Sequence, residues 1–194
     1  MAQFVALDNK VEVNGETVLS IVSGMELFKA EAMKILKQNG IDNPAPGKWY
    51  PQQSWLNAFK TISEKLGAST LFLIGKKIPE NAQWPPFVNS IETALPSIDI
   101  AYHMNHRLGA EPLFNPQTGT MKEGIGHYGF EKTGDFSAVM VCPNPYPCDF
   151  DRGIIESAAK KFKKADARTL KVTHDDSKPC RKKGGDSCTY IITW

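Results

Sequence analysis

The four cysteines of this 194-residue chain are the residues best suited to chemistry, and all of them lie after position 141. Cys142 and Cys148 enclose a proline-rich stretch, whereas Cys180 and Cys188 enclose a turn with two adjacent glycines. A tetrahedral zinc ion takes thiolate, imidazole or carboxylate ligands, and glycines let two ligands on one segment converge on it. Two pairs of soft ligands that flank turns therefore favour a zinc site over places in an apolar core.

Two other fates of the cysteines stay open. An even number of cysteines also arises when they pair in one or two disulfides, and free cysteines are often simply buried as small apolar side chains. The first eight residues show neither the charged part nor the long apolar part of a secretion signal. We therefore expect a reducing, cytoplasmic setting, which favours metal ligands or free thiols over disulfides.

A second set of residues could bind a small molecule. Tyr102 and His106 lie one turn apart on the same face of a predicted helix, and a binding pocket needs mostly apolar walls with a few placed polar groups. The predicted ligand-binding residues are Trp55, Phe59, Tyr102, His106, His127 and Tyr128. Two alternatives stay open: the aromatics form the core while the histidines lie on the surface, or His103 and His106 hold a heme or a second metal ion.

Composition and motifs exclude several classes of function. The chain has 23 basic and 21 acidic residues, so it lacks the strong positive charge of a nucleic-acid-binding protein. A run of about 18 apolar residues, which a membrane-spanning helix needs, is absent from the sequence. Catalytic elbows, phosphate loops and dinucleotide fingerprints are absent as well. We therefore expect a binding protein rather than an enzyme.

The elements that must position these residues begin with helices. Apolar residues at helical spacing predict helices through the first 122 residues, and Gly40 and Gly67 follow the points where the first two should end. Pro96 has no amide hydrogen and should break or kink the last of them near Leu95. The predicted helices span residues 18–36, 51–66, 70–75 and 87–107.

From residue 123 the apolar pattern changes to a period of two, which predicts strands. A helix over residues 151–165, with four lysines on its outer face, separates two pairs of strands. The predicted strands span residues 126–130, 136–142, 170–174 and 188–194. The predicted fold class is α+β: one compact domain with a helical half, residues 1–122, and a half built on an antiparallel sheet of about four strands with a packed helix, residues 123–194.

The order of elements and cysteines in residues 123–194 resembles the 4-vinyl reductase family, whose members are also described as hydrocarbon- or small-molecule-binding domains. It is similar in particular to the sensor domains of phenol- and xylene-responsive activators, which share the fold class of TRAPP transport-complex subunits. In those sensor domains a cysteine before the helix and two cysteines eight residues apart bind structural zinc. The resemblance implies that Cys148, Cys180 and Cys188 are zinc ligands here.

The fourth ligand departs from the family's pattern. The family has an acidic residue three positions before the second of these cysteines, where this chain has Ser177, a poor zinc ligand. Either Cys142 or His174 should replace it, and Cys142 is favoured because it ends a predicted strand six residues before Cys148. The predicted metal ligands are therefore Cys142, Cys148, Cys180 and Cys188.

The resemblance implies a zinc-stabilised sensor domain that binds a small apolar or aromatic molecule without catalysis. One alternative is a subunit or accessory factor for vinyl-group reduction on a tetrapyrrole, and another is a structural module for protein interaction. The family's sensor domains pair, which predicts a homodimer. Apolar residues near the start of the chain could cross to the second subunit, namely Phe4, Val5, Leu7, Val11 and Val13.

Overall fold

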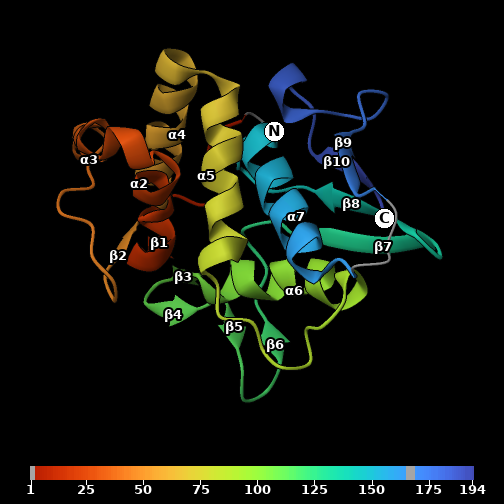
Figure 1. The fold of residues 1–194 in the computed structure, drawn as a ribbon. Coiled ribbons are helices and arrows are strands. Elements are labelled where there is room, and N and C mark those ends of the chain that lie inside the picture. Colours follow the sequence, from red (N-terminus) through yellow and green to blue (C-terminus); the bar gives the residue numbers. More distant parts are fainter. Residues whose placement is uncertain (1–2, 165–168) are drawn as a thin grey trace.

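The structure, a computed structural model, describes residues 3–164 and 169–194 and divides them into a mainly helical part and a part built on a sheet (Figure 1). The first predicted helix is interrupted at Met25 and forms several short segments, while the second and third are confirmed. The helices of this part are α1 (Gly15–Val18), α2 (Ser20–Gly24), the 3-10 turn η1 (Glu26–Phe28), α3 (Lys29–Gln38), α4 (Gln52–Leu66) and α5 (Ala68–Asn81).

The helical part also contains a four-stranded sheet in the order β2-β1-β3-β4, which the sequence pattern did not predict. Its strands are only two to four residues long, too short to show a period of two. The strands are β1 (Val11–Asn14), β2 (Trp49–Pro51), β3 (His106–Leu108) and β4 (Glu111–Pro112), followed by the small hairpin of β5 (Phe114–Asn115) and β6 (Thr120–Met121).

Strand β1 corrects the predicted role of the first residues. Val11 and Val13 are 1% and 0% exposed, because they pack into the core of their own chain between β2 and β3. Val5 and Leu7 are exposed, and Phe4 packs partly against the core. The idea that all five cross to a second subunit therefore fails for the two valines of β1.

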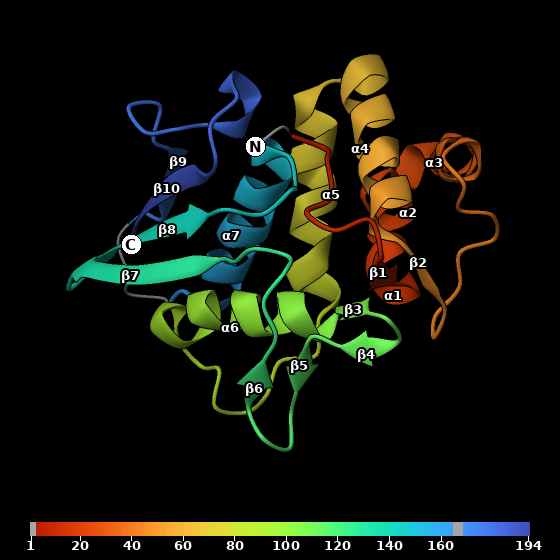
Figure 2. The ribbon, with the colours of Figure 1, turned by 180° about the vertical axis from the view of Figure 1, so that it is seen from behind.

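Helix α6 (Ile91–Met104) runs through Pro96 without the predicted break (Figure 2). Ser90 caps it with a capping box, in which its side chain accepts a hydrogen bond from the Thr93 amide and the Thr93 side chain accepts one from the Ser90 amide. Near the proline, the Ser97 hydroxyl donates to the Thr93 carbonyl at 2.7 Å. The well-capped first turn and this extra bond offset the lost amide donor.

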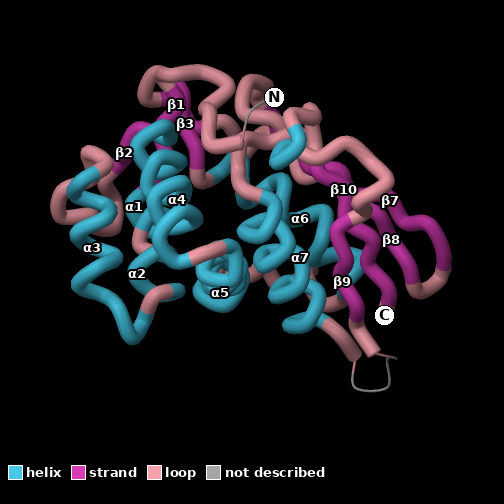
Figure 3. Tube along the Cα trace, turned by 90° about the horizontal axis from the view of Figure 1, so that it is seen from above, coloured by secondary structure: helices cyan, strands magenta, loops and turns pink. Residues whose placement is uncertain are grey.

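The second part is the predicted α+β unit, and its antiparallel sheet of four strands is confirmed. The sheet order is β7-β8-β10-β9, and α6 and α7 cover one of its faces (Figure 3). The elements are β7 (Gly129–Gly134), β8 (Ser137–Cys142), α7 (Cys148–Phe162), β9 (Lys171–His174), the 3-10 turn η2 (Arg181–Lys183) and β10 (Cys188–Thr193). The predicted end of the helix at Ala165 lies outside the described residues.

Helices α5 and α7 lie side by side and join the two parts. A Cβ atom on Gly75 would lie 2.1 Å from the Phe150 carbonyl oxygen, and one on Gly153 would lie 2.3 Å from the Phe72 carbonyl oxygen. Each helix therefore has a glycine where the backbone of the other passes. We call this contact the glycine crossing.

Candidate functional site

A pocket of about 190 Å³ lies between the end of α5, α6 and α7. Four of the six predicted ligand-binding residues line it, and the other two do not. The lining residues among them are Trp55, Tyr102, His106 and Tyr128. Phe59 packs behind Trp55 with 4.6 Å between ring centroids, and His127 instead pairs with Asp99 and Glu123 at the surface. The structure therefore brings most, but not all, of the predicted site together.

Four aromatic residues of the pocket were missed by the sequence pattern, namely Trp84, Phe87, Tyr146 and Phe150. Tyr146 lies in the proline-rich stretch before α7, and Phe150 lies in the first turn of that helix. The ring of Trp55 lies edge-on to both, at 5.2 Å and 5.8 Å between centroids. The signal of Trp84, Phe87 and Tyr146 was weak, because these residues lie next to prolines and show no helical or strand period. Phe150 precedes residue 151, where the predicted helix began.

A chain of hydrogen bonds runs along one wall of the pocket. Gln52 donates to the Tyr146 hydroxyl at 2.9 Å, and this hydroxyl lies 2.6 Å from Nε2 of His106. Nδ1 of His106 lies 2.6 Å from the Tyr102 carbonyl. A carbonyl only accepts, so Nδ1 carries the proton and Nε2 accepts from Tyr146.

Burial sets the charge of His106. The side chain is buried, and the loss of solvation lowers its pKa to about 4, even though the bond to the Tyr102 carbonyl acts the other way. His106 is therefore neutral at pH 7, with a lone pair on Nε2. Among the described residues, the buried indole N–H of Trp55 and Oε1 of Gln52 have no hydrogen-bond partner.

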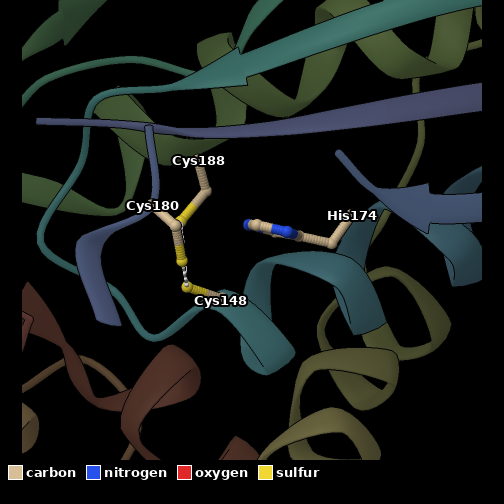
Figure 4. A group of neighbouring side chains, drawn as sticks. All are labelled: Cys148, His174, Cys180 and Cys188. Carbon is tan, nitrogen blue, oxygen red and sulfur yellow. Dashed lines mark hydrogen bonds between the residues drawn. The ribbon is translucent and has the colours of Figure 1, made fainter. Parts of the chain in front are cut away.

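Cys148, His174, Cys180 and Cys188 form a second group, which we call the thiol group (Figure 4). One donor atom from each lies within 4.8 Å of the others. The sulfur of Cys148 lies 2.9 Å from that of Cys188 and 3.6 Å from that of Cys180. Nδ1 of His174 forms a hydrogen bond with Asp176 at 3.0 Å, so Nε2 is the nitrogen that can act as a donor together with the thiols.

Helix starts and turns position the thiol group. Cys148 is the first residue of α7 and Cys188 the first of β10. Gly184, in the left-handed conformation with φ of 82°, turns the chain back after Cys180. His174, the alternative fourth ligand, lies in the group. Cys142 lies outside it, on β8 opposite Cys188 of the neighbouring strand β10.

The contact between Cys148 and Cys188 shifts the pKa values of the two thiols in opposite directions. The hydrogen bond from Cys148 lowers the pKa of Cys188 against the cost of desolvation, and the positive charge of Arg181 acts in the same direction. The same contact raises the pKa of Cys148, because that thiol must keep its proton to donate. The group therefore combines three sulfur donors and an imidazole, which are ligands for a thiophilic metal ion.

Comparison with known proteins gives a fold. No protein-family model and no curated protein sequence matches the chain. Three similar solved structures each match 93% of this chain. One comes from work on heme redox potential and protein-induced porphyrin distortion, with 17% identity, 99% of that chain covered and a TM-score of 0.60. The others are an H-NOX protein from S. oneidensis in the Fe(II) ligation state (13% identity, 95% of that chain, TM-score 0.60) and an oxygen-binding H-NOX domain related to soluble guanylate cyclases, as its oxygen complex (16% identity, 94% of that chain, TM-score 0.61).

These structures correct the family resemblance and what it implied. The similar structures are H-NOX domains, so the assignment to 4-vinyl reductase and hydrocarbon-binding domains is wrong. The predicted cofactor, zinc, and the predicted function, zinc-stabilised binding of an apolar molecule, are wrong for the same reason, because the similar structures are described by their heme and its iron. Neither the vinyl-reductase alternative nor the interaction-module alternative fits these similar structures better. The chain has the fold of the H-NOX domains.

Proposed function

We propose that this chain is a heme-based sensor domain and that His106 would be the residue that ligates the iron. The observation that carries the proposal is a neutral imidazole in the wall of a largely apolar pocket, in a chain with the H-NOX fold. When bound, the heme would supply an iron that takes a small gas molecule as a further ligand.

The donor chemistry of His106 fits this role. Ligating histidines usually donate their other ring N–H to a carbonyl or carboxylate, which fixes the tautomer and the orientation of the ring. Nδ1 of His106 donates to the Tyr102 carbonyl in this way, so Nε2 is the nitrogen left to ligate. The Tyr146 hydroxyl, which now donates to Nε2, has to give up that bond.

The size of the pocket sets a condition on the fit. A volume of about 190 Å³ is close to that of an engineered cavity of about 150 Å³ that binds benzene, so the pocket must widen to take a porphyrin. Gln83 and Phe87 line it and are exposed, so it opens to solvent on their side. Lysine and arginine are absent from the described lining, which leaves solvent to hydrate the heme carboxylates at this mouth.

Titration of the purified protein with hemin tests the proposal through the absorption spectrum. His106→Ala should abolish the histidine-ligated spectrum, whereas Tyr146→Phe should strengthen binding, because it frees the Nε2 lone pair without removing the ring. His127→Ala is the matched control, since His127 lies outside the lining of the pocket. A wild-type spectrum in His106→Ala, or no heme bound by a folded wild-type protein, would overturn the proposal.

We also propose that the thiol group binds a thiophilic metal ion, a structural role separate from the pocket. Three sulfurs and one imidazole within 4.8 Å support it. Elemental analysis after purification under reducing conditions should find about one metal ion per chain, and it should be lost in Cys180→Ser. Cys142→Ser, outside the group, should keep it. A folded, metal-free protein that takes up no added ion would contradict this role.

The homodimer, the cytoplasmic location and the division at residues 122 and 123 remain proposals. Exposed apolar side chains support an interface on the helical part. They are Leu27, Phe28, Leu66 and Leu73 around the surface between η1, α4 and α5. Within the described residues, every helix is too short or too polar to span a membrane.

A further inference from the structure

We propose that Asp99, His103 and His127 bind a divalent first-row transition-metal ion, at a site separate from the pocket and from the thiol group. One donor atom from each of the three lies within 4.8 Å of the others. Asp99 and His103 lie one turn apart on α6, and His127 comes from the loop before β7. The proposal does not depend on heme binding.

The distance between the donors of Asp99 and His127 is close to that between two ligands of a bound ion. Oδ2 of Asp99 lies 2.9 Å from Nδ1 of His127, and the ring centroids of His103 and His127 are 5.0 Å apart. Two ligands at about 2.1 Å from an ion and at right angles to each other are about 3 Å apart. An ion that replaces the proton between Asp99 and His127 therefore needs only small shifts of these side chains.

His103 has a donor atom that the protein leaves unused. Its side chain is fully buried, and Nδ1 is bonded to the Asp99 carbonyl at 2.9 Å. The carbonyl accepts, so Nδ1 carries the proton and Nε2 has the lone pair. Among the described residues, this Nε2 is one of the few buried nitrogens without a partner. A buried polar atom without a partner costs stability unless a ligand satisfies it.

The surrounding structure holds the three donors in place. The Tyr128 amide donates to Oδ1 of Asp99 at 2.8 Å, which orients the carboxylate. The Tyr102 hydroxyl donates to the Ile125 carbonyl at 2.6 Å and ties the loop that carries His127 to α6. Nε2 of His127 is bonded to Glu123 at 2.8 Å, the arrangement in which a second carboxylate supports a ligating imidazole.

The ligand set indicates the kind of ion. Two imidazoles and one carboxylate suit first-row transition metals such as Fe(II), Co(II) and Ni(II), and they leave coordination positions open. His127 is 32% exposed and Asp99 20%, so water or a small anion reaches the open positions. The absence of sulfur separates this site from the thiol group, which selects softer ions.

Cobalt(II) titration of the heme-free protein tests the site, because cobalt absorption distinguishes thiolate from nitrogen and oxygen ligands. We expect one equivalent of cobalt without thiolate charge-transfer absorption. Asp99→Asn keeps the shape of the side chain and the hydrogen bond from the Tyr128 amide. It should lower the affinity for this cobalt ion by more than about a hundredfold, because loss of even an outer partner of a metal site lowers metal affinity 10- to 100-fold. His127→Ala should act in the same way.

His174→Ala and His106→Ala are the controls, because they alter the thiol group and the pocket but leave these three residues intact. Both should keep the thiolate-free equivalent. Circular dichroism of each variant checks that the fold is retained. If the wild type binds no such equivalent, or if folded Asp99→Asn and His127→Ala bind it as the wild type does, the site does not exist, whatever the result with hemin.

Discussion

Asp151 and Arg181 form an ion pair in which neither side chain has exposed surface. Nη2 of Arg181 lies 2.6 Å from Oδ2 of Asp151, and the Tyr128 hydroxyl donates to Oδ1 at 2.7 Å. Desolvation raises the pKa of Asp151 to about 6, although the charge of Arg181 and the bond from Tyr128 act against the rise. The pair connects α7 to the loop that carries the thiol group.

This raised pKa predicts a pH dependence of stability that belongs to one residue. Between its ordinary value of 3.8 and about 6, the folded state holds a proton on Asp151 that the unfolded state has lost. The free energy of unfolding therefore falls as pH rises through this window, by roughly 3 kcal/mol in total from this group. The Asp151→Asn side chain cannot titrate. The free energy of unfolding of the wild type minus that of the variant should therefore decrease from about pH 4 to pH 7.

Urea unfolding of both proteins across this range measures the difference. Other carboxylates titrate in the same range, but they do so in both proteins and cancel. A difference that stays constant or grows with rising pH would show that the pair holds Asp151 ionised throughout. Lys160→Ala, an exposed change on the same helix, should leave the pH trend of the wild type unaltered.

At the scale of residues, local spacing predicted part of the site. Cys180 and Cys188 meet because a glycine turn joins them, and this is visible in the sequence. Whether Cys142 or His174 joins them depends on where β9 and β8 end relative to β10, which only strand register fixes. Tyr146 escaped notice because its position depends on contacts with residues about 40 and 94 positions away.

At the scale of elements, the glycine crossing predicts an unusual response to alanine. Gly→Ala inside a helix ordinarily stabilises by about 1 kcal/mol. At Gly153 the new Cβ would lie 2.3 Å from the Phe72 carbonyl, a backbone atom that cannot move aside alone. We expect Gly153→Ala to destabilise the protein by about 1–3 kcal/mol, as overpacking does.

Thermal and urea unfolding measure this effect, and Gly75→Ala should behave alike because the contact is reciprocal. Lys160→Ala again serves as control, since Lys160 is exposed on α7 and away from the crossing. An unchanged or raised midpoint in both glycine variants would mean that the helices have room to separate.

The prediction of elements succeeded where a long period was present. Helices α4 and α7 and the strands β8 and β10 carry periodic apolar residues and were found close to their true bounds. The first sheet was missed because β1, β2 and β3 pair segments from residues 11, 49 and 106, each too short to show a pattern. The break at Pro96 was wrong because capping and packing outweighed a single lost hydrogen bond.

At the scale of the whole molecule, β1 decides what the first residues do. Deletion of residues 1–13 removes three of the four residues of β1, which pairs with β2 on one side and β3 on the other. We expect the truncated chain to lose its cooperative unfolding transition rather than to become a folded monomer. Circular dichroism and sedimentation of the purified variant would check this, and a compact monomer with native melting would contradict it.

We expect a dimer interface on the exposed apolar surface of the helical part. Leu27 is 91% exposed, so Leu27→Glu should leave the fold intact. Sedimentation of the wild type at tens of micromolar then tests the homodimer itself, and a shift to monomer in Leu27→Glu would place the interface on this surface.

The glycine crossing also limits how the molecule can move. Side chains at a helix contact can change rotamer and absorb a displacement, but two backbones in direct contact cannot be compressed. Ile78 of α5 and Ile154 of α7 both line the pocket, each within one turn of a crossing glycine. The two helices can therefore rotate about the crossing but cannot move closer together there. An occupant that pushes Ile78 away from Ile154 must change the angle between the two helices, so that widening of the pocket becomes rotation of the helical part against the sheet.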